Sequence, residues 1–252
     1  MMVRPGYDVN RYPLVSCIMP TAGRPRLACQ AIACFQAQDY PNKELIVIDD
    51  GDESVSNVIP DDPRIRYSRL ENKNTVGAKR NLACRQAAGE ILVHWDDDDW
   101  MADWRLSYQV DALLTSGAEV CGLSRLLFYD PVSSRSWQYV YPGAESRWVA
   151  GATLCYKKRF WSERPFAHVN VGEDTRFVLA ARSSRIVSLQ NNTFYVAMIH
   201  RRNTSPKQTD DSRYHPYPLD DLRAVLGRNA SFYEEVFRDE AIRLRGECVE
   251  PD

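Results

Sequence analysis

Four consecutive aspartates, residues 96–99, are the residues best placed to do chemistry, because they directly follow the apolar run 90–95. Buried neighbouring carboxylates repel one another and lose hydration, and a hard divalent cation with oxygen ligands relieves both costs. The run therefore predicts a Mg²⁺ or Mn²⁺ site. The alternative is that these acids cap the following helix, with Asp99 or Asp103 at its positive end.

A second acidic group, Asp49-Asp50-Gly51, follows the apolar run 44–49. Alone, this sequence is ordinary turn chemistry. However, Thr21, Asp50 and Asp96 each follow a predicted strand, and parallel strands end at the same edge of a sheet. Open α/β sheets bind ligands in the crevice outside these carboxyl ends. We therefore expect the three residues to lie around one site.

The elements that must position these residues alternate along the first hundred residues. Apolar runs predict strands, helical spacing predicts helices, and Thr75 is placed to cap the second helix. The predicted strands are 14–20, 44–49, 64–70 and 90–95, and the predicted helices are 24–38 and 75–88. This alternation predicts an α/β fold with an open, mostly parallel sheet and right-handed crossovers.

The second half of the chain changes character and predicts a mixed region with antiparallel pieces. Its predicted helices are 104–116 and 172–183, and its predicted strands are 119–129, 136–141, 152–156 and 193–199. A polar, proline-punctuated run, 202–218, predicts a flexible loop or lid. Two short amphipathic helices, 219–226 and 231–244, then close the chain.

Composition excludes several classes of protein. The chain has 32 Lys and Arg residues against 34 Asp and Glu residues, which gives a net charge of -2. A protein with this charge lacks the positive electrostatic potential that binds long nucleic acids. Nowhere do 18 apolar residues run together, so we expect no signal peptide and no membrane span. The seven cysteines are an odd number without a C-x-x-C pair, which favours reduced core cysteines in a cytoplasmic protein.

The motifs, in order along the chain, resemble glycosyltransferase family 2, whose nucleotide-sugar-binding domain has the GT-A fold. The segments that carry the resemblance are PLVSCIMPTAGRP, ELIVIDDGDES, ENKNTVGAKRNLACRQAAGEIL, WDDDDW and VGEDTRF. It covers about residues 13–205 and implies a GT-A-like domain with a small antiparallel part on the acceptor side. The implied division is an extension 1–12, a nucleotide-binding half 13–100, an acceptor half 101–205, and a C-terminal part 206–252 of polar loop and helices.

The resemblance also implies roles for individual residues. The residues expected to bind the nucleotide donor are Thr21, Arg24, Asp50, Arg80 and Asp97. Those expected to hold the Mn²⁺ or Mg²⁺ that bridges the donor diphosphate are Asp96, Asp98 and His200. For His200, a satisfied structural histidine is an equal alternative, because imidazole prefers softer metals.

Catalysis is expected at Asp174, which matches the aspartate of the family's E-D pair. Transfer of a sugar needs a base for the acceptor hydroxyl, and attack from the face opposite the diphosphate inverts the anomeric configuration. The alternative is that Glu173 and Asp174 form an ordinary acidic helix N-terminus. We expect Glu173, Trp100 and Trp148 to contact the acceptor, although aromatic residues at such spacing are more often core residues.

The sequence and the resemblance therefore predict a metal-dependent inverting glycosyltransferase. We expect it to move a UDP-linked sugar to a hydroxyl of a saccharide, lipid-linked or other acceptor. Cell-surface glycan synthesis by a peripheral membrane enzyme fits this prediction. One alternative is a sugar-phosphate nucleotidylyltransferase, but MPTAGRPRL has a single glycine where a phosphate-cradling loop needs several. Another is a non-catalytic module that binds a nucleotide sugar.

Overall fold

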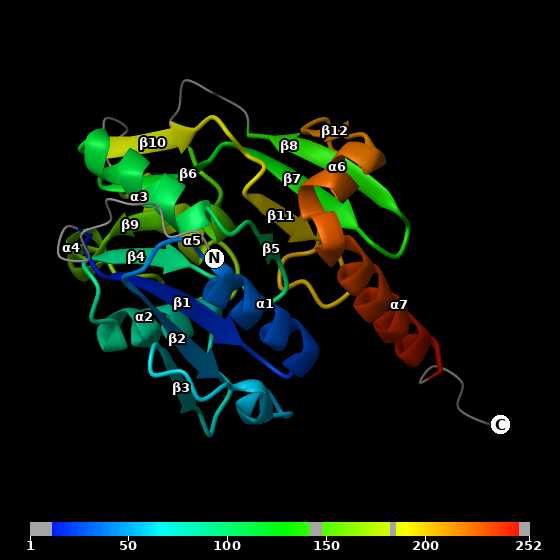
Figure 1. The fold of residues 1–252 in the computed structure, drawn as a ribbon, viewed down its shortest axis with the longest axis horizontal. Helices are drawn as coiled ribbons and strands as arrows, with labels where there is room; N and C mark the ends of the chain where they lie inside the picture. Colours follow the sequence, from blue (N-terminus) through cyan, green and yellow to red (C-terminus); the bar gives the residue numbers. More distant parts are fainter. Residues whose placement is uncertain (1–11, 142–147, 182–184, 247–252) are drawn as a thin grey trace.

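The computed structural model describes residues 12–141, 148–181 and 185–246, which form two sheets with helices packed around them (Figure 1). Nearly all of the expected extension 1–12 lies outside these ranges. The larger sheet has the strand order β10-β6-β9-β4-β1-β2-β3. Its strands are β1 (Val15–Thr21), β2 (Lys43–Asp49), β3 (Ile65–Arg69), β4 (Ile91–His94), β6 (Val120–Leu123), β9 (Cys155–Lys157) and β10 (Ile186–Leu189).

Parallel pairing dominates this sheet, as predicted. Strands β3, β2, β1 and β4 are parallel neighbours, and β10 is parallel to β6. The exception is β9, which lies antiparallel between β4 and β6. The predicted strand 152–156 is replaced by a 3-10 turn, Gly151–Thr153, followed by β9.

Helices cover both faces of the larger sheet. They are α1 (Pro25–Ala37), α2 (Val76–Gln86), α3 (Arg105–Thr115), α4 (Lys158–Glu163) and α5 (Glu173–Leu179), whereas α6 (Leu219–Leu226) and α7 (Ala230–Gly246) lie at the end of the molecule that carries the second sheet (Figure 1). Further 3-10 turns lie at Ser56–Val58 and Gly227–Asn229. Because side chains alternate along a strand, Cys17 and Met19 pack with α1 and α3, whereas Ile18 packs with α2, α4 and α5. Both faces of the central strands are therefore buried, which explains their continuous apolar sequences.

The smaller sheet provides the mixed region expected from the second half of the chain. Its strand order is β12-β8-β7-β11-β5, and the strands are β5 (Trp100–Met101), β7 (Arg125–Asp130), β8 (Arg135–Val140), β11 (Tyr195–Met198) and β12 (Tyr214–Pro216). All pairs are antiparallel except β7 with β11. The predicted strand 119–129 was wrong as one strand: it divides at Ser124 into β6 and β7, which belong to different sheets.

Other boundaries also differ from the predictions. Strand β12 lies inside the run predicted as a loop, where Tyr214 pairs with Tyr139 of β8. Helix α5 ends at Leu179, earlier than predicted. Strand β10, strand β5 and helix α4 were not predicted, because each is too short to show a period and is fixed by its neighbours in space.

Helix α2 shows one correction that matters for the site. Thr75 caps it as predicted, since its hydroxyl accepts a hydrogen bond from Ala78 N at 3.2 Å. The buried stripe, however, includes Lys79 and Arg80, whereas the predicted stripe residue Leu82 is only partly buried. Two cations of this helix therefore face inward.

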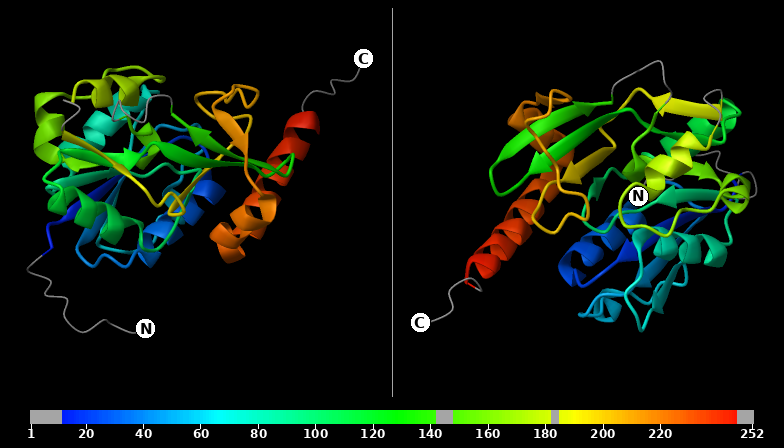
Figure 2. Two further views of the ribbon diagram at one scale, coloured as in Figure 1. Left: turned by 90° about the horizontal axis from the view of Figure 1, so that it is seen from above. Right: turned by 180° about the vertical axis from the view of Figure 1, so that it is seen from behind.

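Both C-terminal helices contribute side chains to the core, and α7 then extends away from the sheets toward the C-terminus (Figure 2). Leu222 of α6 and Phe237 of α7 belong to the same core cluster as α1 and the smaller sheet. Among the described residues, no helix is long and apolar enough to cross a membrane. The described cysteines are free thiols, all buried except Cys29, and Cys248 lies outside the described residues.

Candidate active site

A cleft of about 380 Å³ lies at the carboxyl ends of β1 and β4. Its walls come from these strand ends, from α2, from the start of α5, and from β7, β11 and the loop after β11. Most residues predicted to form the site line this cleft: Thr21, Arg24, Arg80, Asp96, Asp97, Asp98, Glu173 and Asp174. The fold therefore brings together residues that are far apart in the sequence.

The four aspartates after β4 all line the cleft, but their exposure alternates. Asp97 and Asp99 are 2% and 6% exposed, whereas the side chains of Asp96 and Asp98 are 21% and 12% exposed. Burial raises the pKa of Asp97 to about 6, although the Arg24 charge opposes this shift. The carboxylates of Asp96 and Asp98 are therefore the two of this run that are most accessible to a ligand in the cleft.

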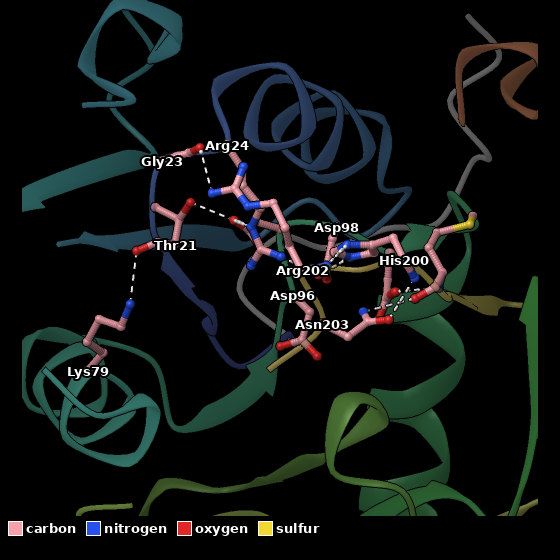
Figure 3. A network of polar contacts seen from close by, with 12 residues as sticks. Thr21, Gly23, Arg24, Lys79, Asp96, Asp98, His200, Arg202 and Asn203 are labelled. Carbon is pink, nitrogen blue, oxygen red and sulfur yellow. Dashed lines mark hydrogen bonds and ion pairs between the residues drawn. The ribbon is translucent and has the colours of Figure 1, made fainter. Parts of the chain in front are cut away.

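Arg24 neutralises part of this acidic cluster (Figure 3). Its guanidinium donates to Asp98 Oδ2 at 2.5 Å, and to Asp97 Oδ1 and Oδ2 at 2.5 and 3.1 Å. The Thr21 hydroxyl donates to Asp97 Oδ2 at 2.6 Å. Burial acts to raise the pKa of Asp98, but Arg24 and a hydrogen bond from His200 outweigh it and hold the pKa below its usual range. Asp98 is therefore a stable anion.

Arg80 joins the acidic cluster to the start of α5. Its guanidinium donates to Asp96 Oδ1 at 3.1 Å and forms a buried ion pair with Glu173. The Arg80 side chain is only 6% exposed. Burial raises the pKa of Glu173, with Arg80 acting against this. Glu173 lines the cleft, but its carboxylate is committed to Arg80, a position different from the acceptor contact predicted for it.

Asp50 lies behind the cleft rather than in its wall. Its oxygens accept from Lys79 Nζ at 2.6 Å and from Asn74 N at 2.7 Å. Lys79 does line the cleft, and its ammonium also donates to Thr21 O at 3.0 Å (Figure 3). A ligand in the cleft therefore meets Lys79 before Asp50.

Asp174 occupies the wall of the cleft at the start of α5. Its Oδ1 accepts from Thr175 N at 2.6 Å, so the residue serves the helix N-terminus while it lines the cleft, and its catalytic role stays a prediction. Its carboxylate packs against Gly151, where an added Cβ would overlap the Asp174 side chain. Among the described residues, no ion pair involves Asp174, in contrast to the neighbouring Glu173.

His200 follows β11 and contacts Asp98 from the side away from the cleft. Its Nε2 lies 3.0 Å from Asp98 Oδ2, and its side chain is 2% exposed. Nδ1 accepts a hydrogen bond from Arg202 N at 3.2 Å, so the neutral ring carries its proton on Nε2. In this arrangement His200 donates to Asp98 and orients it, rather than presenting a lone pair to a metal.

The capping alternative for the aspartate run is wrong. Helix α3 begins at Arg105, and its N-cap residue, Trp104, makes no side-chain capping hydrogen bond. Asp99 instead accepts from Met198 N at 2.7 Å and from the Tyr195 hydroxyl. Asp99 thus holds β11 against the loop that carries the cleft-facing aspartates.

Neither predicted aromatic platform lines the cleft. Trp100 is 7% exposed in the core on β5, and Trp148 packs on Tyr141, with ring centroids 5.5 Å apart. The aromatic residues that line the cleft are Phe128 and Tyr141. The sequence did not show which way each tryptophan side chain points. The positions of β7 and β8 in the smaller sheet bring Phe128 and Tyr141 to the cleft instead.

The oxygen donors of the cleft fit Mn²⁺ or Mg²⁺, which prefer carboxylate and phosphate oxygens. Among the described residues, no three His, Cys, Asp or Glu side chains form a metal-binding group by themselves. The two cleft-facing carboxylates, Asp96 and Asp98, would therefore hold such an ion together with phosphate oxygens of a bound ligand. Mg²⁺ in particular usually keeps few protein ligands beside substrate phosphates.

Three residues around the site were missed from the sequence. Lys79 had a signal, because it lies on the inward face of α2 with Arg80 and Ala83. Gly151 and Phe237 had no signal in the sequence. A glycine is required at position 151 because Asp174 approaches it closely, and Phe237 reaches His200 only through tertiary packing.

The fold and the site define a class: an α/β protein with a largely parallel sheet, whose acidic cleft at the strand carboxyl ends is built like that of a GT-A protein. The family model described as glycosyl transferase family 2 matches residues 16–172. The chain therefore belongs to glycosyltransferase family 2.

Three similar proteins show how far the likeness extends. The GalNAc(5)-diNAcBac-PP-undecaprenol beta-1,3-glucosyltransferase of Campylobacter jejuni is 37% identical over 101 residues, which are 38% of this chain and 33% of that protein. The chain thus spans about a third of that relative's length. Staphylococcus aureus TarS, crystallised with UDP-GlcNAc, aligns with TM-score 0.62 and 19% identity over 87% of this chain and 66% of TarS. The mannosyltransferase PcManGT of Pyrobaculum calidifontis, crystallised with GDP-Man and Mn²⁺, aligns with TM-score 0.61 and 20% identity over 77% and 59%.

Proposed function

We propose that this chain transfers a sugar, with inversion, from a nucleotide diphosphate sugar to an acceptor hydroxyl, using Mn²⁺ or Mg²⁺. One observation carries the proposal: a single cleft holds the carboxylates of Asp96 and Asp98 on one wall and that of Asp174 on another. The first two fit the diphosphate end of a donor, and the third fits the acceptor end.

The donor side is formed by residues of β1, α1 and α2. Lys79 and Thr21 line the part of the cleft nearest β1. Lys79 has a third N–H to donate to a nucleotide, whereas the Thr21 hydroxyl, which donates to Asp97, can accept a hydrogen bond. Asp50 acts through Lys79, since its carboxylate holds the ammonium in place at 2.6 Å. Arg24 can exchange its contact with Asp98 for one with phosphate oxygens, which its planar guanidinium matches.

The chemistry follows from the charges in the cleft. A metal ion at Asp96 and Asp98 would supply Lewis-acid stabilisation of the leaving diphosphate. Asp174 accepts the proton of the acceptor hydroxyl as its oxygen attacks the anomeric carbon. Asp174 is better suited to this than Glu173, because Arg80 already occupies the Glu173 carboxylate. The rings of Phe128 and Tyr141 offer an apolar surface to the acceptor sugar.

The donor and acceptor classes are proposed from the similar proteins. TarS was crystallised with UDP-GlcNAc and PcManGT with GDP-Man and Mn²⁺, and we propose a UDP-linked donor. The Campylobacter jejuni relative is named for an undecaprenyl-diphosphate-linked acceptor. We therefore propose a lipid-linked saccharide as the acceptor, reached by peripheral association with the membrane, in the synthesis of a cell-surface glycan.

The first test is a thermal-shift screen of UDP, GDP, dTDP and CMP with and without Mn²⁺, because a ligand that binds the folded state raises its apparent stability. We expect a shift with UDP that requires Mn²⁺. Asp98→Asn should abolish it, whereas Asp103→Asn, a change at an exposed aspartate close by, should leave it unchanged. Equal shifts for the wild type and Asp98→Asn would refute the role of Asp98.

The second test is turnover of UDP-sugars with undecaprenyl-diphosphate-linked saccharides, with the product's anomeric configuration read by NMR. We expect an inverted product, loss of turnover in EDTA and recovery with Mn²⁺. Metal-dependent UDP binding without transfer or hydrolysis would instead indicate a binding module. A retained configuration would exclude Asp174 as a base in a single displacement.

A further inference from the structure

Three aromatic rings connect the C-terminal helix α7 to the acidic cluster. The His200 ring stacks on Phe237 with centroids 4.7 Å apart and planes 21° apart. Phe237 in turn lies nearly parallel to Tyr233, at 6.3 Å and 16°. The Tyr233 hydroxyl donates to Asp99 O at 3.0 Å. Helix α7 therefore contacts Asp99 directly through Tyr233, and it reaches Asp98 through Phe237 and the His200 ring.

Ion pairs anchor α7 in this place. Arg26, on α1, pairs with Glu235 at 2.9 Å and with Asp239 at 2.8 Å. Arg202, which follows His200, pairs with Glu240 at 3.4 Å. Each pair is exposed and stabilises little by itself. Together they connect α7 to the helix after β1 and to the loop that carries His200.

We propose that Phe237 is a positioning residue of the diphosphate site, which holds the His200 ring so that Nε2 points at Asp98. The inference rests on the proposed function, because it assigns Asp98 to the metal and diphosphate. It also gives a role to α7, which begins at Ala230, well beyond the 16–172 segment matched by the family model.

The physical argument concerns the freedom of an imidazole ring. His200 has one contact at each nitrogen, to Asp98 at 3.0 Å and to Arg202 N at 3.2 Å. These two contacts lie at the ring edge and leave rotation and tilt of the ring open. The face of Phe237, which is 1% exposed, removes this freedom. Residues behind a metal ligand commonly act in this way, by fixing the ligand's orientation.

The test replaces the aromatic ring of Phe237 by an aliphatic side chain. Phe237→Leu keeps an apolar group but loses the stacking face, and Phe237→Tyr keeps the ring. Phe160→Leu is the matched control, since Phe160 is equally buried, at 1%, but packs in the other core cluster around Phe177. Isothermal titration with UDP, in Mn²⁺ and in EDTA, gives the affinities for all variants.

We expect Phe237→Leu to weaken Mn²⁺-dependent UDP binding by about tenfold, the lower range for residues that support a metal ligand. Binding in EDTA should change little, Phe237→Tyr should stay close to the wild type, and Phe160→Leu should not alter affinity. In turnover, the KM for the donor and the Mn²⁺ requirement should rise more than kcat falls.

A spectroscopic measurement separates positioning from general loosening. The His200 Cε1–H resonance, assigned by its absence in His200→Gln, should move in Phe237→Leu because the ring current of Phe237 is lost, and should stay in Phe160→Leu. A folded Phe237→Leu with wild-type Mn²⁺-dependent affinity would overturn the inference alone. A wild type that binds no nucleotide with Mn²⁺ would overturn the proposed function and this inference with it.

Discussion

Replacement of Asp174 by Asn tests the assigned base most directly. The substitution keeps the shape of the side chain and an oxygen that can accept from Thr175 N, the hydrogen bond that Asp174 makes at 2.6 Å. It also keeps the packing against Gly151. What it removes is the negative charge and the ability to accept a proton from an acceptor hydroxyl.

The two interpretations of Asp174 predict different magnitudes. A positioned general base accelerates transfer by about 10²- to 10⁴-fold, so its loss raises the barrier by about 3–5 kcal/mol at 1.36 kcal/mol for each tenfold. A carboxylate that serves only the N-terminus of α5 is worth about 0.3–1 kcal/mol of stability. The fall in rate should then be small.

The assay pairs kcat for UDP-sugar transfer with the affinity for UDP and Mn²⁺. Asp220→Asn is the matched control, because Asp220 is also the second residue of its helix, α6, and is exposed. We expect Asp174→Asn to lose at least a hundredfold in kcat with donor binding intact, and Asp220→Asn to lose nothing. Transfer by Asp174→Asn within threefold of the wild type would refute the reasoning.

Two further predictions concern stability. Arg80→Met leaves the buried Asp96 and Glu173 carboxylates without their cation, so we expect a loss of about 3–5 kcal/mol in urea unfolding at pH 7. The loss should be smaller at pH 5, where Glu173, with its raised pKa, is closer to neutral; an equal loss at both values would contradict this account. Burial lowers the pKa of Lys43 to about 8, so from pH 8 to 10.5 the unfolded state binds more protons and stability rises with pH. As the pH rises from 7.5 to 9.5, the free energy of unfolding of the wild type should increase by roughly 1–2 kcal/mol relative to that of Lys43→Met. If the difference between the two proteins stays constant over this range, the pKa of Lys43 is not lowered.

Much of the larger sheet was predictable from local sequence. The runs that became β1, β2 and β4 are continuously apolar because both their faces are covered, and Thr75 signals the start of α2 by its own side chain. The smaller sheet was not predictable at the same level. Strand β5 has two residues, and β6 and β7 form one apolar run that divides between two sheets only because their pairing partners differ.

The sequence by itself was enough to predict several of the residues that line the cleft, and the chemistry assigned to them stays a prediction. Four acids directly after an apolar run indicated a metal site at residues 96–99, whereas the separate roles of Asp96, Asp98 and Asp174 were implied by the resemblance to glycosyltransferase family 2. The meeting of Thr21 and Asp96 in one cleft followed from parallel strands ending at one edge, whereas Asp174 reaches the cleft from the start of α5. These conclusions depend on periodicity and on residue type, which the linear chain contains.

Only the tertiary structure decided how these groups are partnered. Glu173 pairs with Arg80, Asp50 lies behind Lys79, and His200 is held between Asp98 and Phe237. Each of these contacts joins segments separated by many residues, so no local pattern specifies it. A buried charge takes whichever partner the packed core brings within hydrogen-bond distance, and that distance exists only after the chain has folded.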